Sequence, residues 1–179
     1  MLCLIMAGGR GKRLGYVAKP LLKLCNKPLI EWVVKIAKEV CNFIILAISK
    51  YTIETSYVCR ASYAIECIET SSRGYVEDIS TLLNSLARYP ILVLPSDILI
   101  ESTEILKEFI KQAQQQNVDI VNLAILKRNR EELTGIAFFR SRQGSWINIV
   151  MDSNIIDIDT HTDLEEAREW CKHIESSWR

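Results

Sequence analysis

Short, nearly continuous apolar runs alternate along this chain with longer amphipathic stretches. The runs have the length of buried strands, and in the stretches between them apolar residues recur every three or four positions, as in helices that pack on a sheet. This alternation predicts an α/β fold in which helices cover both faces of a mostly parallel sheet. The expected strands are residues 2–7, 43–48, 63–68, 91–95, 119–126, 135–140 and 155–158, and the expected helices are residues 29–40, 52–60, 76–88, 103–116 and 162–175.

The first strand opens into a loop that combines glycines with cations. The run Gly8-Gly9-Arg10-Gly11-Lys12-Arg13-Leu14-Gly15 closes on Lys19-Pro20-Leu21. Glycine brings backbone N–H groups against an anion with no Cβ in the way, and cations neutralise its charge. The first thirty residues hold six Lys or Arg and no Asp or Glu, whereas the net charge of the whole chain is zero. This local charge predicts a polyphosphate site and argues against nucleic-acid binding by the whole surface.

Two common phosphate loops do not match this run. A Walker A loop needs a glycine where Met6 stands and Ser or Thr where Arg13 follows Lys12. A dinucleotide fingerprint needs a third glycine at Leu14. The residues match instead the pattern A-G-G-x-G-x-R-x-G followed by K-P-L.

Acidic residues follow two other expected strands. Asp97 comes directly after the strand at 91–95, where a Mg²⁺ that bridges nucleotide phosphates needs an oxygen ligand. Asp157 and Asp159 share one face of the late strand, because strand side chains repeat every two residues. One of the two can complete a metal site, and the alternative is a solvated acidic edge. Thr162 and Glu165 predict a capping box for the last helix.

A third loop, residues 69–78, runs from a strand into a helix. Its small hydroxyl residues and glycine let backbone groups approach a flat base, and Ser72, Gly74 and Tyr75 are the candidates for discriminating purines by hydrogen bonding. A helix N-cap is the alternative interpretation, and both can hold together. Because ligands of such sheets bind beyond the carboxyl ends of the strands, the three loops are expected to face one crevice.

Length and cysteine usage bound the remaining possibilities. The 179 residues, 49% of them hydrophobic, fit a single domain over residues 1–179, without a repeat or linker. The first apolar run has six residues, too few for a membrane span or a signal-peptide core. The six cysteines show no C-x-x-C spacing, which predicts buried free thiols in a cytoplasmic protein. They are Cys3, Cys25, Cys41, Cys59, Cys67 and Cys171.

These motifs together resemble the MobA-like nucleotidyltransferase superfamily, whose members transfer a nucleoside monophosphate from an NTP. Four segments carry the resemblance beyond the opening loop: residues 19–25, residues 70–78, the Ser96-Asp97 turn and the ending Asp157-Ile158-Asp159-Thr160-x-x-Asp163-Leu164. The first two look most like the archaeal-type adenosylcobinamide-phosphate guanylyltransferases. The resemblance implies a Rossmann-like, GT-A-like three-layer fold. It also implies transfer of GMP from GTP to adenosylcobinamide phosphate, which gives adenosylcobinamide-GDP and pyrophosphate.

The resemblance also implies roles for individual residues. Backbone groups of the glycine loop would contact the triphosphate, the cations would meet its charge and assist catalysis, and the base would lie at the third loop. Mg²⁺ is the implied cofactor, with Asp159 the better second ligand and Asp157 in reserve. By role, the implied residues are Ala7, Gly8, Gly9 and Gly11 for the backbone contacts, Arg13 and Lys19 for the phosphate charge, Asp97 and Asp159 for the metal, and Ser72, Gly74 and Tyr75 for the base.

Two alternatives stay open for the function. One is a relative that uses another acceptor, such as molybdopterin or a sugar phosphate. Ala18 stands where molybdopterin relatives carry an acid, and five residues separate Arg13 from Lys19, fewer than in sugar-phosphate relatives. The other alternative is a nucleotide-binding module without catalysis. The acceptor is expected over residues 135–151, where Phe138, Phe139 and Trp146 can supply apolar surface, with at least one phenylalanine in the core. No membrane span, nucleic-acid partner or particular oligomeric state is predicted.

Overall fold

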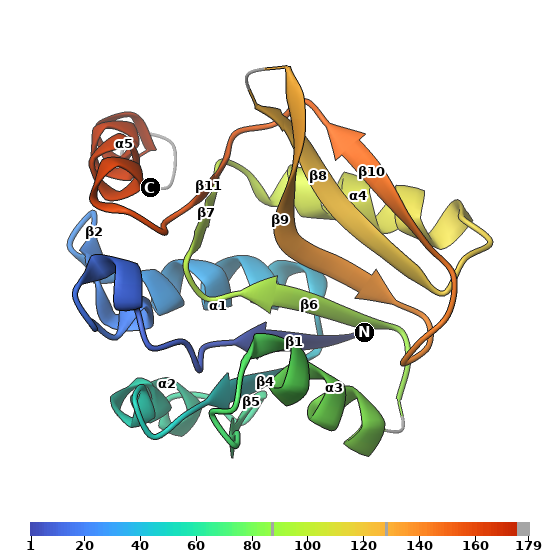
Figure 1. The fold of residues 1–179 in the computed structure, drawn as a ribbon, viewed down its shortest axis with the longest axis horizontal. Helices are drawn as coiled ribbons and strands as arrows, with labels where there is room; N and C mark the ends of the chain where they lie inside the picture. Colours follow the sequence, from blue (N-terminus) through green and yellow to red (C-terminus); the bar gives the residue numbers. More distant parts are fainter. Residues whose placement is uncertain (87, 128, 175–179) are drawn as a thin grey trace.

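The computed structural model describes residues 1–86, 88–127 and 129–174. Within this part of the chain, seven strands form one sheet that runs through the molecule (Figure 1). They are β1 (Leu2–Met6), β4 (Phe43–Ile48), β5 (Ile65–Glu69), β6 (Ile91–Pro95), β8 (Ile120–Lys127), β9 (Arg130–Phe139) and β10 (Trp146–Met151). Their order across the sheet is β10-β8-β9-β6-β1-β4-β5.

Most neighbouring strands are parallel, as the sequence predicts. β1 pairs in parallel with both β4 and β6, β4 with β5, and β10 with β8. β9 is antiparallel to its neighbours β6 and β8. β1 and β6 are the centre of the sheet and are apolar on both faces, which is typical of strands covered by helices on either side.

Helices cover both faces of the sheet and make three layers. On one face lie α1 (Leu29–Val40) and α4 (Thr103–Gln115), and on the other lies α3 (Tyr75–Ser85) (Figure 1). Ile5 of β1 belongs to the core shared with α1 and α4, whereas Leu4 belongs to the core shared with α3. Alternate side chains of one strand thus enter two cores, as strand geometry requires. The three-layer α/β expectation is confirmed.

Several elements differ from the sequence prediction. The expected strand 135–140 is the second half of the longer β9, and the expected helix 52–60 divides into η3 (Ile53–Ser56) and α2 (Tyr57–Arg60). Positions 87 and 175 of the expected helices 76–88 and 162–175 lie outside the described residues. Four strands were not predicted: β2 (Lys23–Leu24), β3 (Lys27–Pro28), β7 (Ile98–Ile100) and β10. Three of these have two or three residues, too few to show a period.

A second, two-stranded sheet stands next to the carboxyl end of β6. β7 pairs antiparallel with β11 (Ile155–Asp157), which places Ile98 opposite Asp157. The chain then continues into α5 (His161–Ile174). A separate hydrophobic cluster, which includes Trp32 of α1 and Ile156 of β11, packs under this region. The late strand is therefore held by packing next to the loop that begins at Asp97.

The cysteines correct the expectation of free thiols. All six form disulfides, which join Cys3 to Cys41, Cys25 to Cys171 and Cys59 to Cys67. The paired Cα atoms lie 5.5–5.8 Å apart, within the range that a disulfide spans. The partners are 8 to 146 positions apart, so their pairing depends on the fold and has no local signal. Because none of the six thiols is free, the cysteines do not support the expectation of a reducing compartment.

Among the described residues, we find no helix with the length and apolar content that crossing a membrane requires.

Candidate nucleotide-binding site

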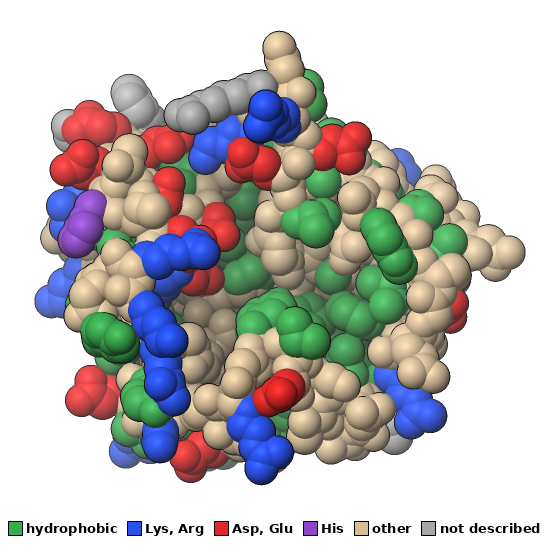
Figure 2. Space-filling view, in the orientation of Figure 1, with side chains coloured by type: hydrophobic (Ala, Val, Ile, Leu, Met, Phe, Trp, Pro, Cys, Tyr) green, Lys and Arg blue, Asp and Glu red, His purple; other side chains and the backbone are tan. Residues whose placement is uncertain are grey.

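A cavity of about 460 Å³ opens at the carboxyl ends of β1 and β6. Figure 2 shows this side of the molecule as a hollow, with Lys and Arg along one border and Asp and Glu gathered above it. The three loops that the sequence singled out all contribute to the lining. The lining residues are Met6, Gly8, Gly9, Arg10, Gly11, Lys12, Lys19, Pro20, Ser72, Arg73, Gly74, Tyr75, Asp78, Pro95, Ser96 and Asp97.

The glycine loop turns sharply along the cavity. Gly11 has φ 57°, in the left-handed region, and a Cβ built on it would lie 2.0 Å from the backbone oxygen of Val17. Only glycine fits this position without moving the backbone. A Cβ on Gly9 would meet no protein atom within 4 Å, so packing does not explain that glycine. The open side of Gly9 leaves room for a ligand to approach the backbone.

Ala7 takes a different place from the one the resemblance implied. It is fully buried, is not part of the lining, and its backbone N–H donates to the carbonyl oxygen of Ala47 on β4 at 2.8 Å. Its amide is therefore not free to contact a phosphate in this structure. The cavity wall begins at Gly8, where a Cβ would lie 3.3 Å from Oγ1 of Thr70 in the third loop.

Three carboxylates meet at the edge of the cavity. Asp97 follows β6, Asp157 ends β11 and Asp159 lies two residues further on, and one oxygen from each lies within 4.8 Å of the others. The opposed oxygen ligands of a Mg²⁺ lie about 4 Å apart, so the three carboxylates fit a divalent cation of this kind. The structure brings both late aspartates to the site, where the sequence analysis preferred Asp159.

The charge of Asp157 is the least compensated of the three. Partial desolvation at the cavity edge, with the negative charges of Asp97 and Asp159, raises the pKa of the solvent-accessible Asp157 to about 6. Such a shift is what crowded carboxylates produce when their mutual repulsion is incompletely neutralised. A divalent cation would supply the missing charge.

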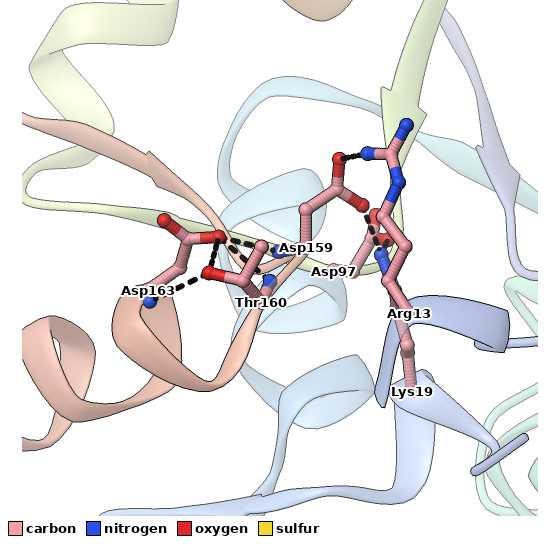
Figure 3. A network of polar contacts seen from close by, with 6 residues as sticks. All are labelled: Arg13, Lys19, Asp97, Asp159, Thr160 and Asp163. Atoms are coloured by element: carbon pink, nitrogen blue, oxygen red, sulfur yellow. Dashed lines mark hydrogen bonds and ion pairs between the residues drawn. The ribbon is translucent and has the colours of Figure 1, made fainter. Parts of the chain in front are cut away.

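Lys19 connects two of these carboxylates (Figure 3). Its Nζ donates to Oδ2 of Asp97 at 2.8 Å and to Oδ1 of Asp159 at 2.5 Å. Burial acts to lower the pKa of Lys19, but attraction to Asp97 and the hydrogen bonds to both carboxylates outweigh it, and the pKa lies above 10.5. The side chain is therefore a permanent cation at neutral pH. Lys19 starts the short helix η2 (Lys19–Leu21), in which Pro20 sets the backbone.

The remaining cations divide into two groups. Arg13 lies on η1 (Lys12–Leu14), outside the lining, and forms an ion pair with Asp159 while its side chain stays 70% exposed (Figure 3). Arg10 and Lys12 line the cavity, and the guanidinium of Arg10 stacks 4.4 Å from the ring centroid of Tyr51. Lys19 thus touches both the cavity and the acids, whereas Arg13 reaches the acids from outside.

The loop between β5 and α3 forms another wall of the cavity. Ser72 has φ 58°, a left-handed conformation that is unusual for a residue with a side chain. Ser72, Gly74 and Tyr75 all line the cavity, so the structure brings the predicted base-binding residues to the same space as the glycine loop. Burial and the charges of Asp97 and Asp157 raise the pKa of Tyr75 to about 12. The Tyr75 hydroxyl therefore stays protonated and is available as a donor near the acids.

Asp78 is a lining residue that the sequence analysis did not single out. It belongs to the first turns of α3, is only 5% exposed, and accepts hydrogen bonds from Thr70 and Ser71. Acids are common in the first turn of a helix, where they complement the helix dipole, so the sequence carries no signal that distinguishes Asp78. Its burial and its place in the cavity wall depend on how α3 packs.

A capping box holds the backbone of Asp159. Oδ2 of Asp163 accepts from the backbone N–H of Asp159 at 3.1 Å and of Thr160 at 2.7 Å, and the Asp163 N–H donates back to Oγ1 of Thr160 at 3.3 Å (Figure 3). The predicted box at Thr162 and Glu165 is wrong, because the helix begins at His161 and the cap lies two residues earlier. The cap fixes the chain where the acid enters the site.

The fold and this cavity define an α/β protein with a glycine-lined, cation-bordered cavity at the carboxyl ends of its central strands. Residues 3–145 match the family model of the MobA-like NTP transferase domain. The chain belongs to this family.

Comparison with known proteins adds individual relatives. The chain is 30% identical, over 92% of its length and 94% of the relative, to the adenosylcobinamide-phosphate guanylyltransferase of Methanocaldococcus jannaschii. A Bacillus anthracis structure described as a glucose-1-phosphate thymidylyltransferase superposes with a TM-score of 0.79 at 15% identity, covering 96% of both chains. HddC from Yersinia pseudotuberculosis complexed with GMP-PN superposes with a TM-score of 0.72 at 18% identity, covering 94% of this chain and 98% of that one. These two structures show the shared fold.

Proposed function

We propose that this protein transfers GMP from GTP to adenosylcobinamide phosphate and releases pyrophosphate. The observation that carries the proposal is the cavity of about 460 Å³ itself, which is lined by the glycine loop and by the ion pair of Lys19 with Asp97. The choice of GTP and of the acceptor is supported by the relative from Methanocaldococcus jannaschii, which the chain matches over nearly its whole length.

The proposed reaction is an in-line displacement at the α-phosphorus. A phosphate oxygen of the acceptor forms a bond to the α-phosphorus of GTP, the bond from that phosphorus to the bridging oxygen of the β-phosphate breaks, and pyrophosphate leaves with the electron pair. No protein nucleophile takes part. Positioning of the two phosphates and neutralisation of their charge supply the rate enhancement.

Each group of the site has a place in this reaction. The backbone of Gly8, Gly9 and Gly11 lies along the triphosphate, and Lys19 meets the charge that develops on the leaving oxygens. Asp97, Asp157 and Asp159 would hold Mg²⁺, which supplies charge neutralisation at the phosphate oxygens when bound. Arg13 reaches one of these acids, Asp159, from the outer side.

The aromatic residues of the segment 135–151, where the sequence predicts the acceptor, differ in exposure. Trp146 is 63% exposed at the start of β10 and offers an apolar surface. Phe138 is 1% exposed and belongs to the core against α4, and half-buried Phe139 packs against the opposite core with Tyr89. Trp146 is thus the exposed one of the three, but it pairs with Ile120 at the amino-end edge of the sheet, away from the cavity, so the expectation that it faces the acceptor is wrong.

Pyrophosphate release by the purified protein tests this proposal. Each of the four common NTPs is supplied with Mg²⁺ and with adenosylcobinamide phosphate, molybdopterin or a hexose 1-phosphate. We expect release with GTP and adenosylcobinamide phosphate alone. Release with molybdopterin or a hexose phosphate would assign another acceptor, and nucleotide binding without release under any condition would favour a binding module.

A further inference from the structure

Asp78 is a buried carboxylate that the proposed transfer reaction does not use. Among the described residues, it is the one Asp, Glu, Lys or Arg that belongs to the buried class, with 5% of its surface exposed. Charged groups are rarely buried unless they have partners or a function. Asp78 nevertheless lines the cavity, so part of the small surface that it keeps faces the ligand space.

Two hydroxyl groups hold the carboxylate of Asp78 in place. Oγ of Ser71 donates to Oδ1 at 2.8 Å, and the one proton of the Thr70 hydroxyl is shared between Oδ2 at 3.1 Å and the carbonyl oxygen of Ile48 at 3.2 Å. An ionised carboxylate has about four acceptor positions, two on each oxygen. At least one position on each oxygen therefore stays available.

The location of Asp78 selects the part of a nucleotide that it can meet. Its backbone N–H donates to the carbonyl oxygen of Gly74 at 2.9 Å, which fixes the residue behind the Ser72–Gly74 turn. The glycine loop with Lys19 and the metal-binding acids come from other loops, at residues 8–19 and 97–159, and this wall contributes Arg73. Because a carboxylate repels the negatively charged phosphates, Asp78 is suited to the base and not to the phosphates.

We propose that Asp78 reads the guanine base by accepting hydrogen bonds from its N1–H and N2–H₂ groups. These two donors lie next to each other on one edge of guanine, so the two free acceptor positions of one carboxylate can take both. Hydrogen bonds to a charged acceptor are stronger than neutral ones, and a paired arrangement fixes the orientation of the base. Thr70 and Ser71 act as positioning residues, because they orient Asp78 without touching the base.

The same arrangement rejects the other purine. Adenine presents a lone pair at N1 and has no amino group at C2, so it would leave a buried carboxylate without donors at these positions and facing another acceptor. Hypoxanthine keeps N1–H but lacks the amino group, so it would satisfy one of the two oxygens. The expected order of affinity is therefore GTP, then ITP, then ATP.

Binding measurements on Asp78→Asn test the proposal, which deepens the choice of GTP in the proposed function. Titration calorimetry with GTP, ITP and ATP in Mg²⁺ needs no acceptor, so it is independent of whether the corrinoid assignment holds. Loss of hydrogen bonds to a charged group predicts a fall in the GTP-to-ATP affinity ratio of about tenfold or more. The Asn amide can also donate to adenine N1, which would strengthen ATP binding and lower the GTP-to-ATP affinity ratio further.

Glu77→Gln is the matched control, because Glu77 is the exposed neighbouring acid on the same turn of α3. It should leave the ratio unchanged. The ratio is measured within one preparation, so partial unfolding of Asp78→Asn lowers both signals equally. A purely structural role of Asp78 predicts a lower melting temperature with the wild-type ratio, and that result would overturn the proposal.

The wild-type protein offers a test that does not depend on any variant. N1-methyl-GTP lacks the N1 donor, and we expect it and ITP to bind at least several-fold more weakly than GTP. Binding of all three with equal affinity would show that this edge is not read and would overturn the role of Asp78. Equal binding of ATP and GTP by the wild-type protein would refute GTP as the substrate in the proposed function. An unchanged affinity ratio in Asp78→Asn, with GTP still preferred by the wild type, would refute only the role of Asp78.

Discussion

Nζ of Lys19 lies 2.8 Å from Oδ2 of Asp97, although the two residues are 78 positions apart in the chain. The contact joins the loop after β1 to the loop after β6, the two neighbouring central strands of the sheet. A divalent cation and an ammonium group cannot share the space between the same carboxylates. We therefore expect Lys19 to turn toward the phosphates when the metal and nucleotide bind, so that the pair seen here is an arrangement of the free protein.

Asp97→Asn should nearly abolish turnover while the protein stays folded. Removing a carboxylate from the metal site takes away several kcal/mol of charge stabilisation in the transition state, and about 1.4 kcal/mol corresponds to a tenfold change in rate. Pyrophosphate release at saturating GTP measures the effect, and circular dichroism checks the fold. Asp152→Asn, at an exposed acid on the loop before β11, is the matched control. Activity of the Asp97 variant within about threefold of wild type would remove Asp97 from the metal site.

Lys19→Ala should lower kcat by a larger factor than it weakens GTP binding. The charge that Lys19 meets grows as pyrophosphate leaves, so its effect belongs mainly to the transition state. Steady-state kinetics with varied GTP separate kcat from KM. Lys23→Ala, an exposed lysine on β2, should leave both unchanged. If only KM rose, Lys19 would serve to anchor the ground state.

The metal site should make stability depend on pH. The pKa of Asp157 is about 6 in the folded protein and 3.8 as an isolated group, so the folded state holds the proton more tightly. The charge of Asp157 lowers the stability of the folded protein above about pH 6, and this cost disappears as pH falls toward about 4. Stability decreases as pH rises wherever the folded state binds more protons than the unfolded state. Asp157 is an exposed residue, so water screens part of this cost.

Mg²⁺ should therefore raise the melting temperature more at about pH 7.5 than at about pH 5. Bound metal offsets the repulsion only where Asp157 is charged. Thermal melts with and without Mg²⁺ at the two pH values check this. Asp157→Asn should stabilise the metal-free protein near neutral pH and reduce the dependence on pH. An equal Mg²⁺ effect at both pH values would separate Asp157 from metal binding.

The opening loop and the acid after β6 could be predicted because their chemistry is local. Four glycines and four cations near one strand end show in the sequence, and so does an aspartate at the end of an apolar strand. Parallel strands bring their carboxyl ends to one edge, so the meeting of Lys19 with Asp97 follows from the topology.

What depends on long-range packing could not be predicted. Asp78 resembles any acid in the first turn of a helix until α3 packs on the sheet and buries it. The disulfide between Cys25 and Cys171 joins positions 146 residues apart, and no spacing rule signals it. The strand β10 carries the polar Asn148 among apolar residues, and its parallel partner β8 is 26 positions away. In each case the deciding contact lies outside any local window.

The N-terminal cap of α5 lies at Thr160 and not at Thr162, and variants of the two threonines test this difference. Thr160→Ala removes the hydroxyl that bonds Asp163, which should cost about 1 kcal/mol of stability, as loss of a helix cap usually does. Thr162→Ala, at the position that the sequence pattern favoured, should cost little. Thermal melts of the two variants distinguish the boxes.

The activity of the same two variants tests whether the cap serves the site. Asp163 also accepts from the backbone N–H of Asp159, so loosening the cap should disturb an acid that contacts Lys19. We expect Thr160→Ala to lower kcat several-fold at a temperature where it is fully folded, and Thr162→Ala to keep wild-type kcat. Equal kcat in both variants, with the stability difference retained, would limit the cap to stabilising α5. Loss of stability in Thr162→Ala alone would restore the cap that the sequence pattern predicts.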